Sequence, residues 1–302
     1  MTVAEYLLKF WVSLALVYIF YWLVLRPLTF YQWNRFYLLI YSLLSFALPF
    51  ANITPWIREK DIEDFRLLNR IPAKSGNYAA QSNLYNQLSS ADWLFVIGAA
   101  GSLVLIVRML IQLVSFRQVK KKSAMLFRRD NIRIYQNSAS SSTFSFGNAV
   151  YLNPSLHSEE EVQRIIQHEM VHVRQRHTID IMFGEFLCIM AWYNPFCWLI
   201  RYAIRQNLEF IADNNVLLKG YDKEEYQYLL LKVVGAPQYS IASYFNLPDL
   251  KKRIIMMNKL KSARLHLTRF LFILPMLAVL LLAFRSGITQ QPMMERFLQL
   301  ME

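Results

Sequence analysis

Two histidines four residues apart, His168 and His172, are the residues of this sequence best suited to carry chemistry. Four residues of an α-helix turn through about 400°, so both imidazole rings face the same way. Glu169 lies between them, one position round the helix, and can reach whatever the histidines hold. The pattern His-Glu-x-x-His is the one with which zinc peptidases bind their metal and place a general base beside it.

A catalytic zinc ion needs three protein ligands and one open position for water, so a third ligand must come from elsewhere in the chain. Glu209 follows His172 by 37 residues (209 − 172), which leaves room for one helical hairpin. Asp213 shares its helix face and can accept an N–H from a ligand histidine, which would fix the imidazole tautomer. We predict that His168, His172 and Glu209 bind zinc. Glu169 is the predicted base, which takes a proton from water and delivers it to the leaving amine.

Three further residues are weaker candidates for the same site. Arg205 lies four residues before Glu209 and could orient it or stabilise the oxyanion of the reaction, but an ion pair on a helix face explains it equally well. His177 and Asp180 follow the His-Glu-x-x-His helix, and either could support a ligand. A cation at a helix end is the simpler account of His177.

The composition indicates a membrane protein with one modest soluble domain. The chain has 302 residues, of which 55% are hydrophobic and only 18% charged, below the roughly 25% of soluble domains. The formal net charge of +12 is concentrated beside apolar segments, which favours positive-inside anchoring over direct nucleic-acid binding. Cys188 and Cys197 lack metal-ligand spacing and are expected to be buried thiols. The cations that flank the apolar segments are Arg117, Lys120, Lys121, Lys122, Arg128, Arg129, Lys251, Lys252, Arg253, Lys259, Lys261, Arg264 and Arg269.

Four apolar segments are each close to the ~20 residues that a bilayer requires. They cover residues 6–25, 36–57, 93–116 and 267–284. The loop between the first two holds Arg26 and Arg35 and no acid, so we place it inside the cell. The N-terminus and the loop at about 58–91 are then outside, residues 117–266 are cytoplasmic, and the tail 285–302 is a short external segment.

The cytoplasmic domain is expected to begin with two strands, at 132–136 and 149–153, which are rich in β-branched and aromatic residues. The serine-rich stretch 138–145 is a turn or hairpin tip. The helix that carries the histidines should start at Ser158, because Ser158 and Glu161 fit a capping box. Its apolar stripe consists of Val162, Ile166, Met170 and Val173. A substrate is expected to lie extended beside the strand 149–153.

The apolar run 181–204 resembles a fifth span but is interrupted at 193–195 by Tyr-Asn-Pro. We interpret it as two helices that pack against the membrane helices or the inner leaflet, which holds the site close to the membrane surface. The helix carrying Glu209 should end near Gly220. Asp222, with Glu225, should cap the helix after it. The fold class is thus mainly α, with four transmembrane helices and an α+β gluzincin-type zinc peptidase domain inserted between helices three and four.

The sequence resembles the BlaR/MecR-type membrane metallopeptidase family, in particular its members from Bacteroidetes-like bacteria. Four segments carry this resemblance: 168–177, 192–196, 209–213 and 144–147. The order of three spans, a zinc domain and a fourth span is similar as well. The resemblance implies an endopeptidase of the bacterial inner membrane that responds to an outside signal by cleaving a cytoplasmic repressor, and often itself.

Partners implied by this reading are a cytoplasmic protein substrate, membrane lipid and, as an open question, a second copy of the chain. The penicillin-binding sensor domain of the best-known members is not found after residue 284, so the resemblance gives no ground for a β-lactam receptor. Two other functions remain open. One is a membrane quality-control peptidase similar to the HtpX/CAAX-protease group, and the other is a non-catalytic sensor or scaffold with structural zinc.

Overall fold

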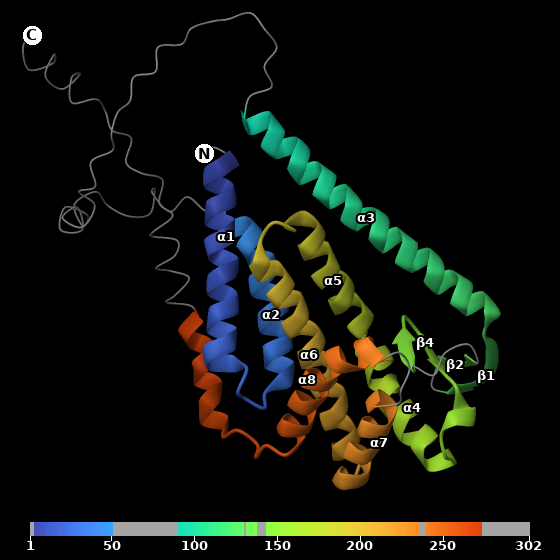
Figure 1. Ribbon diagram of the computed structural model, residues 1–302. Helices are drawn as coiled ribbons and strands as arrows, with labels where there is room; N and C mark the ends of the chain where they lie inside the picture. Colours follow the sequence, from blue (N-terminus) through green and yellow to red (C-terminus); the bar gives the residue numbers. More distant parts are fainter. Residues whose placement is uncertain (1–2, 51–89, 130, 138–142, 236–239, 274–302) are drawn as a thin grey trace, which may run out of the picture.

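The computed structural model describes residues 3–50, 90–129, 131–137, 143–235 and 240–273. Its first two helices form an antiparallel hairpin (Figure 1). Helix α1 (Val3–Phe20) continues as a π-helical segment, Tyr21–Leu25, and α2 (Tyr31–Ala47) continues as a 3₁₀ segment, Leu48–Phe50, which contains Pro49. Because α2 begins at Tyr31, Arg35 lies on this helix and not in the loop where we had placed it.

Helix α3 (Ser90–Lys122) is long and leans away from the α1–α2 hairpin (Figure 1). Two helical segments, Glu5–Leu25 and Val96–Lys122, are long and apolar enough to cross a membrane. The second predicted span falls partly outside the described residues. The fourth falls mostly outside them, and its first residues belong to a 3₁₀ helix, Arg264–Phe272. The count of four spans therefore stays a prediction.

A four-stranded mixed sheet follows α3, in the order β1-β2-β4-β3. Its strands are β1 (Ala124–Arg129), β2 (Ile132–Gln136), β3 (Phe144–Phe146) and β4 (Ala149–Leu152). β2 and β4 are the two strands expected from the sequence, and they pair in parallel. β3 and β4 form an antiparallel hairpin whose turn holds Gly147 at φ 57°, a conformation that glycine adopts without strain.

The position of β4 contradicts the expected substrate site beside residues 149–153. β4 pairs with β2 on one side and with β3 on the other, so its main-chain groups already serve the sheet on both sides. Among the described residues β3 pairs with β4 alone, and it packs beside the helix that carries the histidines. The edge next to the candidate site is therefore β3.

The helix with the two histidines is α4 (Glu159–Arg174), and it begins as predicted. The Ser158 hydroxyl accepts the Glu161 backbone N–H, and the Glu161 carboxylate accepts the Ser158 N–H, which completes a capping box. The predicted apolar stripe of α4 packs on the sheet. This small core contains Ile132, Ile134, Val150, Leu152, Val162, Ile166, Met170 and Val173.

The apolar run 181–204 forms two helices, as predicted, named α5 (His177–Met190) and α6 (Pro195–Leu218). Asn194 is fully buried at the junction, and its side chain accepts the N–H of Phe196. Both helices pack against α1 and α2 in one core. The members of that core from this hairpin are Leu187, Cys188, Ala191, Cys197, Ile200, Ala203, Ile204, Leu208, Phe210, Ile211 and Ala212.

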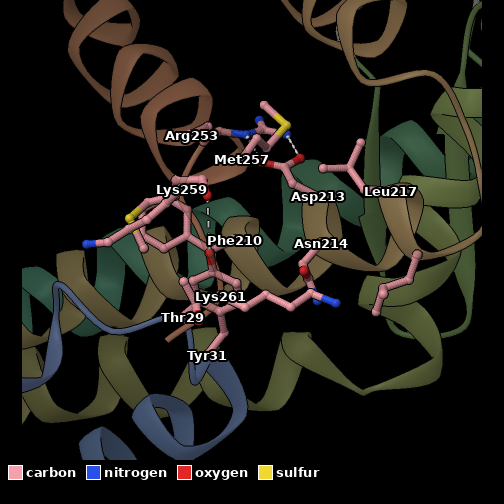
Figure 2. A pocket seen from close by; sticks show the side chains of 12 residues that line it. Thr29, Tyr31, Phe210, Asp213, Asn214, Leu217, Arg253, Met257, Lys259 and Lys261 are labelled. Atoms are coloured by element: carbon pink, nitrogen blue, oxygen red, sulfur yellow. Dashed lines mark hydrogen bonds and ion pairs between the residues drawn. The ribbon is translucent and has the colours of Figure 1, made fainter. Parts of the chain in front are cut away.

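Two more helices complete the part of the chain that holds the site: α7 (Lys223–Gly235) and α8 (Ser240–Met257). Gly220 has φ 87° just past α6, and the Asp222 carboxylate accepts the Glu225 N–H at the start of α7, both as predicted. A cavity of about 230 Å³ lies between the start of α2, α6 and the end of α8 (Figure 2). Its walls include Thr29, Tyr31, Phe210, Asp213, Arg253 and Lys261.

Candidate active site

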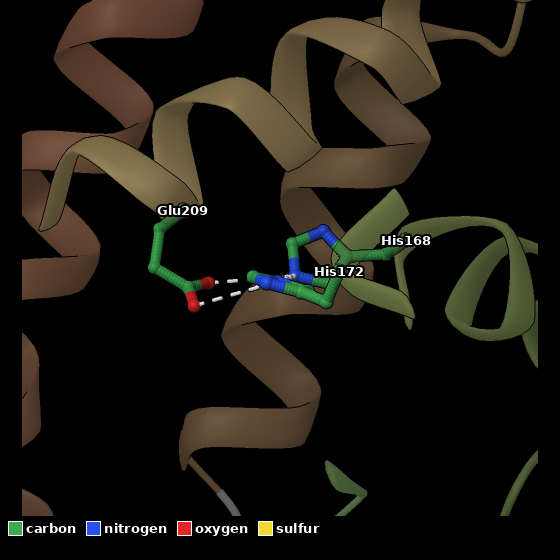
Figure 3. Close-up of side chains that lie close together, drawn as sticks. All are labelled: His168, His172 and Glu209. Atoms are coloured by element: carbon green, nitrogen blue, oxygen red, sulfur yellow. Dashed lines mark hydrogen bonds and ion pairs between the residues drawn. The ribbon is translucent and has the colours of Figure 1, made fainter. Parts of the chain in front are cut away.

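Three donor groups from α4 and α6 converge on one point (Figure 3). The Nε2 atoms of His168 and His172 lie 3.2 Å apart. One carboxylate oxygen of Glu209, Oε2, lies 3.4 Å from Nε2 of His168. The other, Oε1, lies 3.6 Å from Nε2 of His172. His168 is buried, whereas His172 and Glu209 are partly exposed, so the cluster is open on one side.

These distances match what a tetrahedral zinc ion requires of its ligands. Two donor atoms that each lie about 2.0–2.1 Å from zinc at the tetrahedral angle are roughly 3.3–3.4 Å apart. The three separations here are 3.2, 3.4 and 3.6 Å. Two imidazole nitrogens and a carboxylate are also a donor set that zinc commonly takes in catalytic sites. The types and spacing of these residues therefore fit a zinc ion.

The Nδ1 atom of His168 faces away from the cluster, towards a carboxylate and a phenol. It lies 3.3 Å from the Asp213 carboxylate and 2.8 Å from the Tyr226 hydroxyl, which itself donates to Asp213 at 2.8 Å. Asp213 is almost fully buried and so can serve only as a fixed acceptor. A proton on Nδ1 of His168 leaves the lone pair of Nε2 for a metal.

The Nδ1 atom of His172 also faces away, towards another histidine. His177, at the start of α5, places its own Nδ1 2.8 Å from Nδ1 of His172. His177 is fully buried, and the sequence offered two accounts of it. The contact with His172 favours the account in which it supports a candidate ligand.

Sequence reasoning missed the cation that holds the two carboxylates. Arg253 on α8 lies 2.6 and 2.8 Å from the two oxygens of Asp213 (Figure 2). Arg253 also lies 3.0 Å from Glu209. We had assigned Arg253 to the basic cluster that flanks the fourth span, which is wrong, because its side chain is largely buried. Tyr226 was also missed. Each lies on an apolar helix face, where a polar group needs a buried partner, and that was the available signal.

The electrostatics of the cluster keep its carboxylates charged. Burial alone would lower the pKa of His168, but hydrogen bonds with Asp213 and Glu209 outweigh it and raise this pKa to about 9. Burial would raise the pKa of Asp213, yet Arg253 holds it at about 2. Arg253 likewise holds the pKa of Glu209 well below its usual range against burial. Both carboxylates are therefore ionised at neutral pH.

The other two histidines of the site, His172 and His177, have pKa values lowered below the usual range of an imidazole. Burial lowers the pKa of His172, opposed by the negative charges of Glu209 and Glu169. Burial, with His172 beside it, lowers the pKa of His177 to about 3. Neutral imidazoles are what a metal site and a hydrogen-bonded support both need.

Two other predicted site residues have contrasting positions. Glu169 is buried on α4, next to His168, where its charge acts on His172. Arg205 does not orient Glu209. Its guanidinium pairs with Glu185 of α5 at 2.5 Å, together with Arg201, and this corrects the role suggested from its spacing. The ion pair that Arg205 makes joins two helices, so the alternative suggested from the sequence, an ion pair on one helix face, is not what the structure shows either.

Comparison with known proteins identifies one family. The family model described as BlaR1 peptidase M56 matches residues 5–257, which include most of α1, the sheet and every residue of the cluster described above. A search of curated proteins found no match.

Proposed function

The chain belongs to the M56 family of BlaR1 peptidases, and on this premise we propose that it is a membrane-anchored zinc endopeptidase that transmits a signal by cleaving a protein. We propose further that the substrate is a cytoplasmic repressor-like protein, and that the chain also cleaves itself. The proposed location is the bacterial inner membrane, with the peptidase domain on the cytoplasmic side. Two apolar helices and the family support the membrane association.

The observation that carries this proposal is the convergence of His168, His172 and Glu209 at ligand distances, with Glu169 on the same helix. Zinc held by such residues supplies Lewis acidity, which brings the pKa of water close to neutral. Glu169 accepts the proton of the attacking water and passes it to the leaving amine. Asp213 and His177 keep the two imidazoles in the tautomers that leave Nε2 free.

The edge strand β3 is the proposed place for the substrate backbone. An extended peptide that adds to a sheet edge gains main-chain hydrogen bonds without a specific sequence. β3 pairs only with β4 among the described residues and packs beside α4. The β3–β4 turn is tied to the start of α5 by the Gly147 N–H, which donates to the Thr178 hydroxyl at 3.1 Å. A peptide on β3 would therefore run close to the histidines.

The decisive variant is Glu169→Gln in the full chain. The amide cannot accept the proton of water, and Glu169 is not one of the three clustered donors, so zinc content should stay at the wild-type level while cleavage falls by at least about 100-fold. Glu159→Gln, on the exposed first turn of α4, is the matched control and should cleave normally. Zinc content and cleavage are measured in the same membrane preparations.

Three outcomes would change the assignment. A Glu169→Gln protein that cleaves at the wild-type rate would exclude the peptidase mechanism and favour a scaffold with structural zinc. Loss of zinc from this variant would make Glu169 a ligand. Finally, if the fragments that depend on Glu169 come from misfolded membrane proteins and not from a repressor, the chain would act in quality control, like the HtpX/CAAX-protease group.

A further inference from the structure

A chain of hydrogen bonds leads from His172 out of the cluster and into helix α2. The ring of His177 contacts His172 through Nδ1 at 2.8 Å, and its Nε2 lies 3.3 Å from the side-chain oxygen of Gln175. The same oxygen accepts from the Gln32 amide at 2.7 Å and from Arg35 at 3.2 Å. Both of these donors belong to the first turns of α2.

Arg35 is the point where α2 holds the junction between α4 and α5. One of its nitrogens donates to the backbone oxygen of Gln175 at 2.8 Å, and its Nε lies 2.8 Å from the Asp180 carboxylate. The Arg35 and Asp180 side chains are only 14% and 4% exposed, so this ion pair is shielded from water. A single guanidinium thus binds the end of α4 and the first turn of α5 together.

The backbone of the junction shows why His177 can reach His172. Residues five apart on one helix point in different directions, so the chain must turn between them. It does so at Arg176, which has φ 55° and ψ 39°, a left-handed conformation that costs a non-glycine residue about 1–2 kcal/mol. The turn at Arg176 brings His177 back over α4. Arg35 and Gln32 contact Gln175, the residue just before this turn.

One assignment of protons satisfies the whole series of hydrogen bonds from His172 to α2. If His172 presents Nε2 to a metal, its proton is on Nδ1 and is donated to Nδ1 of His177. The proton of His177 is then on Nε2 and is donated to the Gln175 oxygen, which accepts from Gln32 and Arg35 as well. Each donor therefore meets an acceptor, and no group has to change tautomer.

We infer that His177, Gln175 and Arg35 are positioning residues that fix the orientation of His172, and that they couple helix α2 to the metal site. A shift of α2 would move the donors on Gln175, loosen His177 and change how tightly His172 holds the metal. A movement of α2, which contributes no donor to the cluster, would thereby change the metal affinity of the site. This inference rests on the proposed zinc site and adds a route by which a signal reaches it.

The test measures zinc affinity and the visible spectrum of the cobalt-substituted protein, both on the full chain in detergent. Residues that orient a ligand from outside usually change metal affinity by 10–100-fold when they are lost. His177→Phe should therefore weaken zinc binding by about 10–100-fold and shift the cobalt bands. His177→Gln should recover most of the affinity, because an amide can accept from His172 and donate to Gln175.

The contribution of α2 is isolated with Arg35. Arg35→Lys keeps the cation beside Asp180 but loses the forked donors to Gln175, and it should still weaken zinc binding several-fold. Combining Arg35→Lys with His177→Phe should cost no more than His177→Phe alone, because both changes interrupt one chain. Arg164→Met, which removes an ion pair elsewhere on α4, is the control. Its effect on zinc affinity should be independent of that of His177→Phe, so the double variant should show the product of the two single effects.

The outcomes separate this inference from the proposal beneath it. If His177→Phe and Arg35→Lys lower the melting temperature but leave zinc affinity and the cobalt spectrum as in wild type, the chain is structural and the coupling is wrong. Independent, multiplying effects of the two changes would also overturn the coupling. A wild-type chain that binds no zinc would overturn the proposed function itself and this inference with it.

Discussion

At the scale of single residues, the cluster depends on how its two carboxylates are neutralised. Glu209 and Asp213 lie one helical turn apart on α6 and are both ionised, so they repel each other, and Asp213 is buried. Arg253 bridges them from α8 at 2.6 to 3.0 Å. The same residue therefore stabilises the fold and fixes the carboxylate that completes the cluster.

We expect Arg253→Met to destabilise the protein by about 3–5 kcal/mol, because removing one partner of a buried ion pair leaves uncompensated charge. Added zinc provides another cation beside Glu209, so the loss should be smaller when zinc is present. The measurement is the unfolding midpoint in detergent, first with a chelator and then with zinc. Arg164→Met, whose acidic partners are exposed to solvent, should cost no more than about 1 kcal/mol.

Equal losses for the two arginine variants would show that Arg253 is not the residue that neutralises the cluster. A loss at Arg253 that zinc does not reduce would show that zinc does not bind beside Glu209.

The sequence predicts only the part of the cluster that is encoded by spacing. His168 and His172 share a face because of helix geometry, and Asp213 shares one with Glu209 for the same reason. Arg253 is 40 residues (253 − 213) from its partner, and no periodicity relates the two. Its position among other cations made it look like a membrane anchor, so only the fold could assign it.

At the scale of elements, the contact between α3 and the α5–α6 turn depends on two glycines with different surroundings. A Cβ atom at Gly101 would lie 2.2 Å from the ring of Trp192, whereas one at Gly98 would meet nothing within 4 Å. The Trp192 indole donates to the Gly98 carbonyl at 3.0 Å, and the Ser102 hydroxyl donates to the Ile189 carbonyl at 2.8 Å. The backbone of α3 therefore packs directly on the end of α5.

Gly101→Ala should separate α3 from α5 and lower stability by about 1–3 kcal/mol, the usual cost of overpacking. Gly98→Ala is the matched control on the same helix. It should be neutral or stabilising by up to about 1 kcal/mol, because alanine has the higher helix propensity. Thermal unfolding of both variants in the same detergent checks the prediction, and a Gly101→Ala protein as stable as Gly98→Ala would contradict the observed packing.

Local signals predicted the helices better than the sheet. The Ser158 capping box and the Asn194 break act within a few residues, so they could be identified before the fold was known. β1 was missed, and β3 was suggested only by the resemblance of residues 144–147 to the family's hairpin, because short strands are stabilised by partners elsewhere in the sheet. Since pairing was not visible in the sequence, the inner strand β4 was mistaken for an edge.

At the scale of the whole molecule, the α5–α6 hairpin runs alongside α1 (Figure 1). The ring of Phe196, next to the hairpin turn, lies 6.0 Å from that of Trp11 in the middle of α1. The cluster of His168, His172 and Glu209 lies near the opposite end of the hairpin, where α1 and α2 are joined. At that end the Thr29 N–H donates to the Ser262 hydroxyl at 3.1 Å, and the Ser262 N–H donates to the Thr29 hydroxyl at 2.8 Å.

These contacts bear on the orientation that the loop charges predict. The loop between α1 and α2 and the segment before the fourth predicted span touch each other, so they must lie in the same compartment. Both are basic, and both were placed inside the cell by the positive-inside rule. Reporter fusions after Arg128 and after Gly287 should therefore give opposite compartments, cytoplasmic for the first and external for the second.

A third fusion, after Thr29, makes this experiment independent of the fourth span. It should report the same compartment as the fusion after Arg128, because an even number of crossings, α2 and α3, separates the two positions. If the fusions after Arg128 and Gly287 share a compartment while those after Thr29 and Arg128 agree, residues 267–284 do not cross. If the fusions after Thr29 and Arg128 disagree, either α2 or α3 does not span the membrane. If α2 is the helix that does not span, the proposed coupling of α2 to the His168–His172–Glu209 cluster would originate from a helix at the surface of the bilayer.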